Sequence, residues 1–255
     1  MTRQPALFIA HGAPTIAIED SEATRAYRRF GESLRSASAI VLASAHWQTR
    51  GSARVNAVAK PEPIYDFGGF PDELYKIRYD APGAPELARR IAALLNVPLE
   101  TERGWDHGVW TPLLHLLPEA KIPVVELSLP HPAEPRHLLA IGRKLSPLRD
   151  EGIVIAGSGG IVHNLSLLRF GQAGAPPDPW AQSFDDWVAE RVAARDFDAL
   201  ADYRNREEAR LAVPTPEHFE PLFIACGASR DDDTFVEIAQ GIEYGNLSMR
   251  SFAFV

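Results

Sequence analysis

The sequence is poor in cysteine, which limits the kinds of site it can build. Its 255 residues include one cysteine, Cys226, so an internal disulfide is impossible and a cysteine-rich zinc site is excluded. Cys226 lies in the apolar stretch 222–227, where a small buried thiol is a common packing residue. Any bound metal must therefore be held by histidine, aspartate or glutamate.

Basic residues and long apolar runs are also scarce. Lysine and arginine number 26 against 34 acidic residues, and the net charge of -8 disfavours nucleic acid or an anionic membrane as the main partner. No apolar run approaches the roughly 18 residues that span a bilayer, and residues 1–5 lead directly into an apolar run at 6–10. We therefore expect a cytoplasmic protein with a small-molecule ligand. Whether it forms a homo-oligomer is left open.

Apolar runs alternate with amphipathic segments along the chain. This alternation favours an α/β fold of three layers, α/β/α, with a central sheet that is mostly parallel or mixed. Because α/β folds of ~200–250 residues often form one unit, a single domain over residues 1–255 is predicted. Strands are predicted at 6–10, 39–44, 123–128, 152–156, 234–238 and 249–255, and helices at 22–37, 85–96, 136–145, 180–195 and from 216 onward.

The stretch 58–83 is rich in proline and glycine and predicts a long surface loop. It also carries aromatic residues, among them Phe67 and Phe70, which allow it to pack against the domain. Long ordered loops in compact domains are often lids or binding loops.

Three of the eight histidines directly follow predicted strands. His11 follows the run 6–10, His46 follows 39–44, and His163 lies just beyond the strand at 152–156 and its glycines. Ligands of open α/β sheets bind at the carboxyl ends of the strands, so these imidazoles are expected to converge. Imidazole suits zinc, iron, copper or nickel. The pattern therefore predicts a metal site at this edge of the sheet.

Two further histidines lie in suggestive surroundings. His107 follows Asp106 and lies between Trp105 and Trp110, whose rings could form an apolar wall for a flat ligand. His218 is expected in the first turn of a helix, after the prolines at 214 and 216.

The remaining three histidines point less clearly to a site. His115 lies in a run of leucines and is expected to be a hydrogen-bonded core residue, while His137 is expected to be exposed on a helix. His131, between two prolines, could lie at the rim of the site.

Several short motifs follow one another at consistent spacing. They are HGAP at 11–14, SAHW at 44–47, YDFGGFP at 65–71, DHGVWTPL at 106–113, GSG at 157–159, VHNL at 162–165, PEH at 216–218 and SMRSF at 248–252. In this order, and over almost the whole length, the chain resembles the class III extradiol dioxygenases of the LigB superfamily, most closely the 4,5-DOPA dioxygenase branch. The resemblance implies a LigB-like fold.

The resemblance also implies a ligand set. It places the metal on His11, His46 and His218, whereas classical members of the superfamily use two histidines and one glutamate. Glu217 and Glu220 lie beside His218 in the sequence, so the identity of the third ligand is left open. Fe(II) is the metal expected for activity, and Zn(II) is expected to compete for the same nitrogen ligands.

The implied reaction is the ring opening of a catechol such as DOPA by O2, beside the two hydroxyls, to a semialdehyde. His163 is then the acid/base, or a fourth ligand when zinc is bound, and His107 lines the substrate pocket. Trp47 and Trp110 are expected to pack against the aromatic ring. Arg250 and Arg50 are candidates for the amino-acid end of a DOPA-like substrate.

Two other functions compete with this reading. One is a zinc-dependent hydrolase in which three histidines polarise a water and His163 acts as base. The other is a non-enzymatic metal-binding member of the same superfamily. The presence of His163 beside a full ligand set argues against the second, because a retired site need not keep its acid/base.

Overall fold

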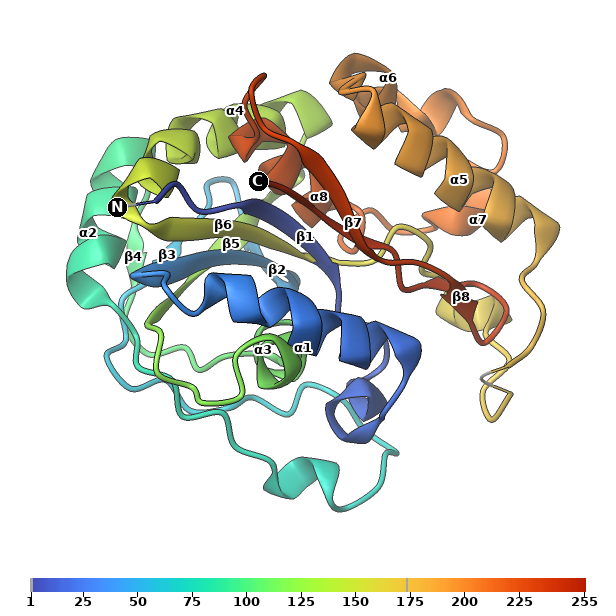
Figure 1. Ribbon diagram of the computed structural model, residues 1–255, viewed down its shortest axis with the longest axis horizontal. Helices are drawn as coiled ribbons and strands as arrows, with labels where there is room; N and C mark the ends of the chain where they lie inside the picture. Colours follow the sequence, from blue (N-terminus) through green and yellow to red (C-terminus); the bar gives the residue numbers. More distant parts are fainter. Residues whose placement is uncertain (1, 173) are drawn as a thin grey trace.

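The computed structural model describes residues 2–172 and 174–255, and a mixed eight-stranded sheet forms its middle layer (Figure 1). The strand order is β4-β3-β5-β2-β6-β1-β10-β7. Strands β5, β2, β6 and β1 run parallel to one another, whereas β10 runs antiparallel to both of its neighbours, β1 and β7. The strands are β1 Ala6–Ala10, β2 Ala39–Arg50, β3 Val55–Asn56, β4 Leu99–Glu100, β5 Val124–His131, β6 Ile153–Gly159, β7 Phe235–Ala239 and β10 Ser251–Phe254, with a separate pair β8 Ile242–Glu243 and β9 Leu247–Ser248.

Helices cover both faces of the sheet (Figure 1). One face carries α1 (Glu22–Leu34) and α3 (His107–Leu116). The other carries α2 (Pro85–Leu95), α4 (Pro135–Leu145) and α8 (Glu220–Ala228), and α5 (Pro179–Ala193), α6 (Phe197–Ala201) and α7 (Ala209–Ala212) lie beyond α8. None of the helices in the described residues has the length and apolar character needed to cross a membrane.

Alternating side chains of the central strands fill two separate cores. In β1, Phe8 packs on the α4 and α8 side, while Leu7 and Ile9 pack on the α1 and α3 side. β6 repeats the pattern, with Ile155 on the first side and Val154 on the second. Strands buried on both faces read as continuous apolar runs, which is why these segments were recognisable in the sequence. The predicted three-layer α/β fold is confirmed.

The clearest departure from the sequence prediction is β2. The strand was expected to end at residue 44, but it continues to Arg50 through an irregular stretch: Ala43 pairs with Leu127 and Gln48 with Leu129, so extra residues bulge between them. Bulges of this kind re-aim side chains and are frequent beside active sites. His46 lies within this bulge instead of after the strand.

Smaller departures concern element ends. The helix predicted at 22–37 ends at Leu34, the strand predicted at 152–156 extends to Gly159, and the helix expected from 216 begins only at Glu220. His218 therefore precedes α8 instead of lying in its first turn. The segment 58–83 is a long loop as predicted, with one short 3-10 helix, η2 (Leu74–Lys76), and isolated bridges to residues 105 and 124.

Close contact between α4 and α8 depends on a glycine. A Cβ atom at Gly142 would lie 2.3 Å from the carbonyl oxygen of Ile224, which is backbone and cannot turn away. Although alanine is the better helix former by up to about 1 kcal/mol, we expect Gly142→Ala to lower the free energy of unfolding by about 1–3 kcal/mol, because overpacking separates the two helices. Chemical denaturation measures this difference. Gly174→Ala, where a Cβ meets open space, is the control, and equal stabilities of the two variants would contradict the packing argument.

Candidate metal centre

His11 stands at the carboxyl end of the central strand β1, in a tightly held position. The Tyr27 hydroxyl donates to the carbonyl of Ala10 at 2.7 Å, and the Ala10 amide donates to Ser251 Oγ at 2.9 Å, so the end of the strand is fixed from two sides. Gly12 then adopts a φ of +61°, a left-handed conformation that glycine accepts without strain. The chain therefore turns away directly after His11 and leaves its imidazole at the edge of the sheet.

His218 reaches the same edge from the turn before α8. The backbone amide of Gly160 donates to the carbonyl oxygen of His218 at 2.8 Å. This approach requires a glycine at the neighbouring position, because a Cβ at Gly159 would lie 2.1 Å from that same carbonyl oxygen. The end of β6 thus fixes the backbone of His218.

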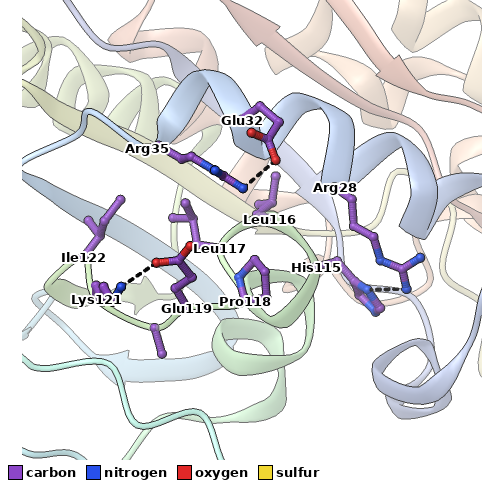
Figure 2. Close-up of a pocket in the computed structure, with 11 residues that line it drawn as sticks. Arg28, Glu32, Arg35, His115, Leu116, Leu117, Pro118, Glu119, Lys121 and Ile122 are labelled. Atoms are coloured by element: carbon purple, nitrogen blue, oxygen red, sulfur yellow. Dashed lines mark hydrogen bonds and ion pairs between the residues drawn. The ribbon is translucent and has the colours of Figure 1, made fainter.

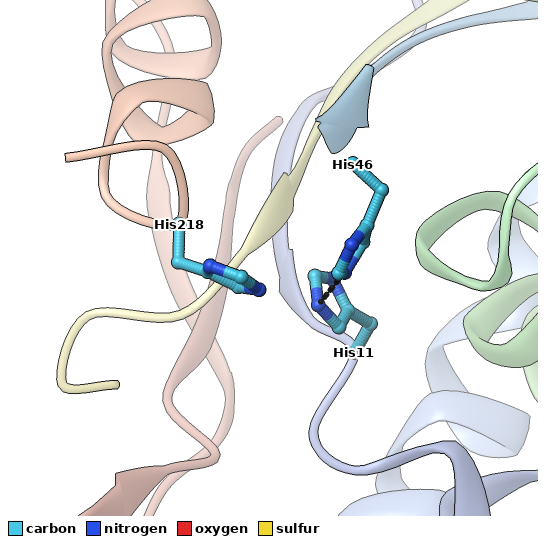
Figure 3. Close-up of side chains that lie close together, drawn as sticks. All are labelled: His11, His46 and His218. Carbon is cyan, nitrogen blue, oxygen red and sulfur yellow. Dashed lines mark hydrogen bonds between the residues drawn. The ribbon is translucent and has the colours of Figure 1, made fainter. Parts of the chain in front are cut away.

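The imidazoles of His11, His46 and His218 converge in space (Figure 3). One ring nitrogen from each lies within 4.8 Å of the other two. The Nε2 atoms of His11 and His46 are 3.0 Å apart, and the ring centroids of His218 lie 5.3 Å and 4.9 Å from those of His11 and His46. Three elements distant in the sequence therefore present nitrogen atoms to one point.

The opposite nitrogen of each ring has its own oxygen partner. His11 Nδ1 lies 3.0 Å from Ser158 Oγ, whose own hydrogen is donated to the carbonyl of Gly108, so Ser158 accepts and His11 Nδ1 carries the proton. His46 Nδ1 lies 3.4 Å from Asp66, and His218 Nδ1 lies 3.2 Å from Glu217. A carboxylate only accepts, so His218 Nδ1 also carries a proton, whereas His46 and Asp66 are in electrostatic contact. The Nε2 atoms of His11 and His218 therefore present lone pairs inward, as in histidines that ligate metals, and the Nε2 atom of His46 lies beside that of His11.

These inward nitrogen atoms fit a metal ion. His218 Nε2 is buried and has no hydrogen-bond partner, and the Nε2 atoms of His11 and His46 lie 3.0 Å apart and face each other. Burial, reinforced by neighbouring imidazoles, lowers the pKa of His11 and His46 far below the usual value and that of His218 to about 4, so the rings stay neutral. Three neutral imidazoles are a donor set for zinc or iron.

The two glutamates near His218 occupy other positions. Glu217 accepts hydrogen bonds from His218 Nδ1 and Thr215, and Glu220 lies 3.5 Å from Gln48. Burial raises the pKa of Glu220 to about 7, which disfavours its charged form. Among the described residues, the group that could hold an ion contains His218 and neither glutamate.

His163 and His107 flank the cluster. The ring of His163 stacks parallel on that of His218, with centroids 3.5 Å apart and planes 7° apart. His107 is the first residue of α3, and its ring centroid lies 4.0 Å from that of His46. Asp66 accepts hydrogen bonds at 3.0 Å from both the backbone amide and Nδ1 of His107. These interactions lower the pKa of Asp66 although burial opposes them. Asp66 thus orients His107 and His46 together.

A cavity of about 270 Å³ opens beside the three imidazoles. It is lined on one side by the loop residues Phe67 and Phe70, and the ring of Phe67 stands perpendicular to that of His107 at 5.6 Å. The full lining is Gly12, Ala13, Pro14, His46, Asp66, Phe67, Gly68, Phe70, His107, His163, Leu165, Leu168, Phe170, His218 and Leu247.

Trp47 and Trp110 do not line this cavity, so their predicted place against the ring is corrected. The guanidinium of Arg103 lies over the Trp47 ring at 5.0 Å, and Trp110 is fully buried, with its indole N–H donating to the carbonyl of Ile64 at 3.2 Å. Both tryptophans therefore pack within the protein and do not face the cavity. Phe67 and Phe70 are the aromatic residues of the predicted loop 58–83 that line the cavity.

The other histidines lie outside the cavity. His115 is buried and hydrogen-bonded to the carbonyl of Ile16 at 2.7 Å and to Arg28 at 3.2 Å, as expected of a core histidine. It borders a separate hollow whose cations are paired, such as Lys121 with Glu119 at 2.7 Å (Figure 2). His137 is exposed as expected, and His131, exposed at the end of β5, does not reach the rim of the site.

Sequence reasoning missed the residues that orient the ligands. Ser158, Asp66 and Glu217 lie in motifs that the sequence shows, yet none was predicted to orient a ligand, and Glu217 was considered only as an alternative third ligand. A carboxylate directly before a candidate ligand, as Glu217 is before His218, could have signalled one of them. Asp66 and Ser158 meet their histidines only through the folded sheet and loop.

Comparison with known proteins identifies the family. Residues 5–253 match the family described as the catalytic LigB subunit of aromatic ring-opening dioxygenase. The chain is 41% identical to a 4,5-DOPA dioxygenase extradiol of Escherichia coli K12 (98% of this chain, 94% of the relative) and 38% identical to one of Beta vulgaris (97% and 95%). It is also similar to the crystal structure of an uncharacterized Escherichia coli K12 protein, with a TM-score of 0.85 and 37% identity over 99% of this chain and 100% of the other. The chain therefore belongs to the LigB family, in the branch of the 4,5-DOPA extradiol dioxygenases, and is a ring-cleaving oxidoreductase.

Proposed function

We propose that this chain, as a single catalytic domain over residues 1–255, opens the ring of a catechol such as DOPA with O2, using Fe(II). The observation that carries the proposal is the set of three convergent imidazole nitrogens beside a cavity with space for one aromatic ring. Extradiol cleavage breaks the ring bond between one hydroxyl-bearing carbon and the adjacent carbon that carries no hydroxyl. Both atoms of O2 enter the product, which carries an aldehyde and a carboxylate.

His11, His46 and His218 would hold the metal, with Ser158, Asp66 and Glu217 fixing their orientation. Iron(II) held there would relay electrons from the catechol to O2 and so allow the two to react. Histidine nitrogens alone do not select iron over zinc, because zinc binds such donors more tightly. A preparation that contains zinc is therefore compatible with the proposal.

His163 is proposed as the acid/base. Its ring lines the cavity and stacks on His218, so it lies beside a substrate hydroxyl that is directed at the metal. Imidazole can take the proton of that hydroxyl and return it later in the reaction. His107, held by Asp66, would position the substrate from the opposite side.

Oxygen uptake tests the proposed reaction directly. Protein loaded anaerobically with Fe(II) is expected to consume O2 when given a catechol and to form a yellow ring-opened product, whereas the zinc-loaded protein consumes none. An oxygen electrode and absorption spectra measure both. Hydrolysis by the zinc form, with no O2 uptake by the iron form on any catechol, would favour the zinc-dependent hydrolase instead.

Substitutions separate the ligands from the acid/base. His11→Ala, His46→Ala and His218→Ala are expected to lose both bound metal and turnover, because each removes one of three donors. His163→Ala is expected to keep the metal and lose about 10²–10⁴-fold in kcat, the usual contribution of a general acid or base. Metal analysis and O2 uptake on the same samples distinguish the two classes. Full activity of the His163 variant would refute its role.

Asp66 offers a test of ligand orientation. Asp66→Asn is expected to weaken metal affinity by about 10–100-fold, because the ligating His46 loses the carboxylate charge that lies 3.4 Å from its Nδ1. Competition with a chromophoric chelator measures this affinity without turnover. Asp72→Asn, an exposed aspartate of the same loop, is the matched control. Unchanged affinity in the Asp66 variant would show that the loop does not support the metal site.

A further inference from the structure

The active-site cavity contains no cation for a substrate carboxylate. Of the described residues that line it, none is lysine or arginine, and the only carboxylate is Asp66, which is already hydrogen-bonded to His107. Much of the remaining lining is apolar and includes Leu165, Leu168 and Phe170 together with the loop residues Phe67 and Phe70. A charged substituent on the catechol ring would lose water here without gaining a partner.

Arginines in the neighbouring segments are neutralised by acids of the chain. Arg169, between two cavity residues, donates to Asp178 at 2.8 Å and to the carbonyl of Pro176. Arg250, the candidate for the amino-acid end of DOPA, is buried and paired with Asp185 at 2.7 Å and with Glu237. Redirecting either guanidinium to a substrate would leave its own acid unpaired.

Arg103 and Arg50 do not serve a substrate carboxylate either. Arg103 pairs with Asp106 at 2.8 Å and covers Trp47. Arg50, the second candidate for the amino-acid end, is exposed at the end of β2 and is absent from the cavity lining.

A second hollow continues from the cavity. It has a volume of about 260 Å³ and shares Ala13, Phe70 and Phe170 with the cavity, to which it adds Thr15, Gly171 and Tyr244. The rings of Phe170 and Tyr244 are 6.1 Å apart, and Phe170 is 58% exposed, so an aromatic surface is open at this point. None of the described residues that line this hollow is charged.

From this charge-free, aromatic extension we propose that the enzyme favours catechols with a bulky, neutral, apolar substituent over DOPA itself. The catechol ring occupies the cavity beside the three histidines. Its substituent lies between Phe70 and Phe170 and reaches the hollow beside Tyr244. The inference rests on the proposed catechol cleavage and specifies the substrate class of that same site.

A series of catechols that share one carbon skeleton tests the substrate class. The probes are 3,4-dihydroxyphenylpropionate, its methyl ester, its benzyl ester and L-DOPA. Binding is measured by calorimetry on zinc-loaded protein without O2, and kcat/KM by O2 uptake on iron-loaded protein. We expect the benzyl ester to bind and react best, at least about tenfold better than the free acid and L-DOPA, with the methyl ester between them. Equal or better binding of the acid or of L-DOPA would overturn the inference and leave catechol cleavage intact.

A pair of variants tests whether the substituent binds at Phe170. Phe170→Arg introduces a cation at the shared wall and is expected to shift the acid-to-ester ratio of Kd by at least about tenfold toward the acid. Leu167→Arg introduces the same charge three residues away, at a residue that is 44% exposed but does not line the cavity, and it should leave the ratio unchanged. Equal ratios in the two variants would refute the assigned position. If the zinc form shows the expected preference but no catechol is cleaved by the iron form, the reaction is wrong and the binding preference stands.

Discussion

Three imidazole nitrogens that face one another dominate the architecture of this site. Hydrogen-bond acceptors outside the cluster hold the protons of His11 and His218 on Nδ1, and the Nε2 atom of His218 has no partner in the protein. An arrangement of this kind is costly without a cation, because buried polar atoms need partners. The surrounding structure holds these nitrogen atoms in place although their burial lowers the stability of the metal-free protein. This is expected of a site that is formed before the metal binds.

Each ligand is held by a different backbone device. Hydrogen bonds at the end of β1 place His11, the bulge in β2 redirects His46, and the close approach of β6 to the turn before α8 fixes His218. Only the first device is local to a strand end. The site therefore depends on the relative placement of the sheet and α8, and the glycines that allow this contact are as important for the geometry as the histidines.

The sequence was most informative where burial and periodicity coincide. Continuous apolar runs located the parallel strands, and their ends located His11 and His163. The sequence was less informative where the geometry depends on pairing between strands that are far apart in the chain. The bulge at His46 arises from the register of β2 against β5, and the sequence of β2 alone does not specify that register. The prediction placed Trp47 and Trp110 at the cavity. A hydrophobic pattern indicates that a ring is buried, but it does not indicate whether the ring lies beside the cavity or packs elsewhere in the protein.

The position of β1 in the sheet has a consequence for how the chain folds during synthesis. β1 is made before the other described strands, yet its two neighbours are β6 and β10, which follow it by about 140 and 240 residues. The backbone groups of β1 that pair with β10 stay without those partners until residues 251–254 have left the ribosome. Pairings of such long sequence separation form slowly, so the apolar first strand is exposed to chaperones and to aggregation for most of translation. The strand that fixes His11 is thus among the last to acquire its complete hydrogen bonding.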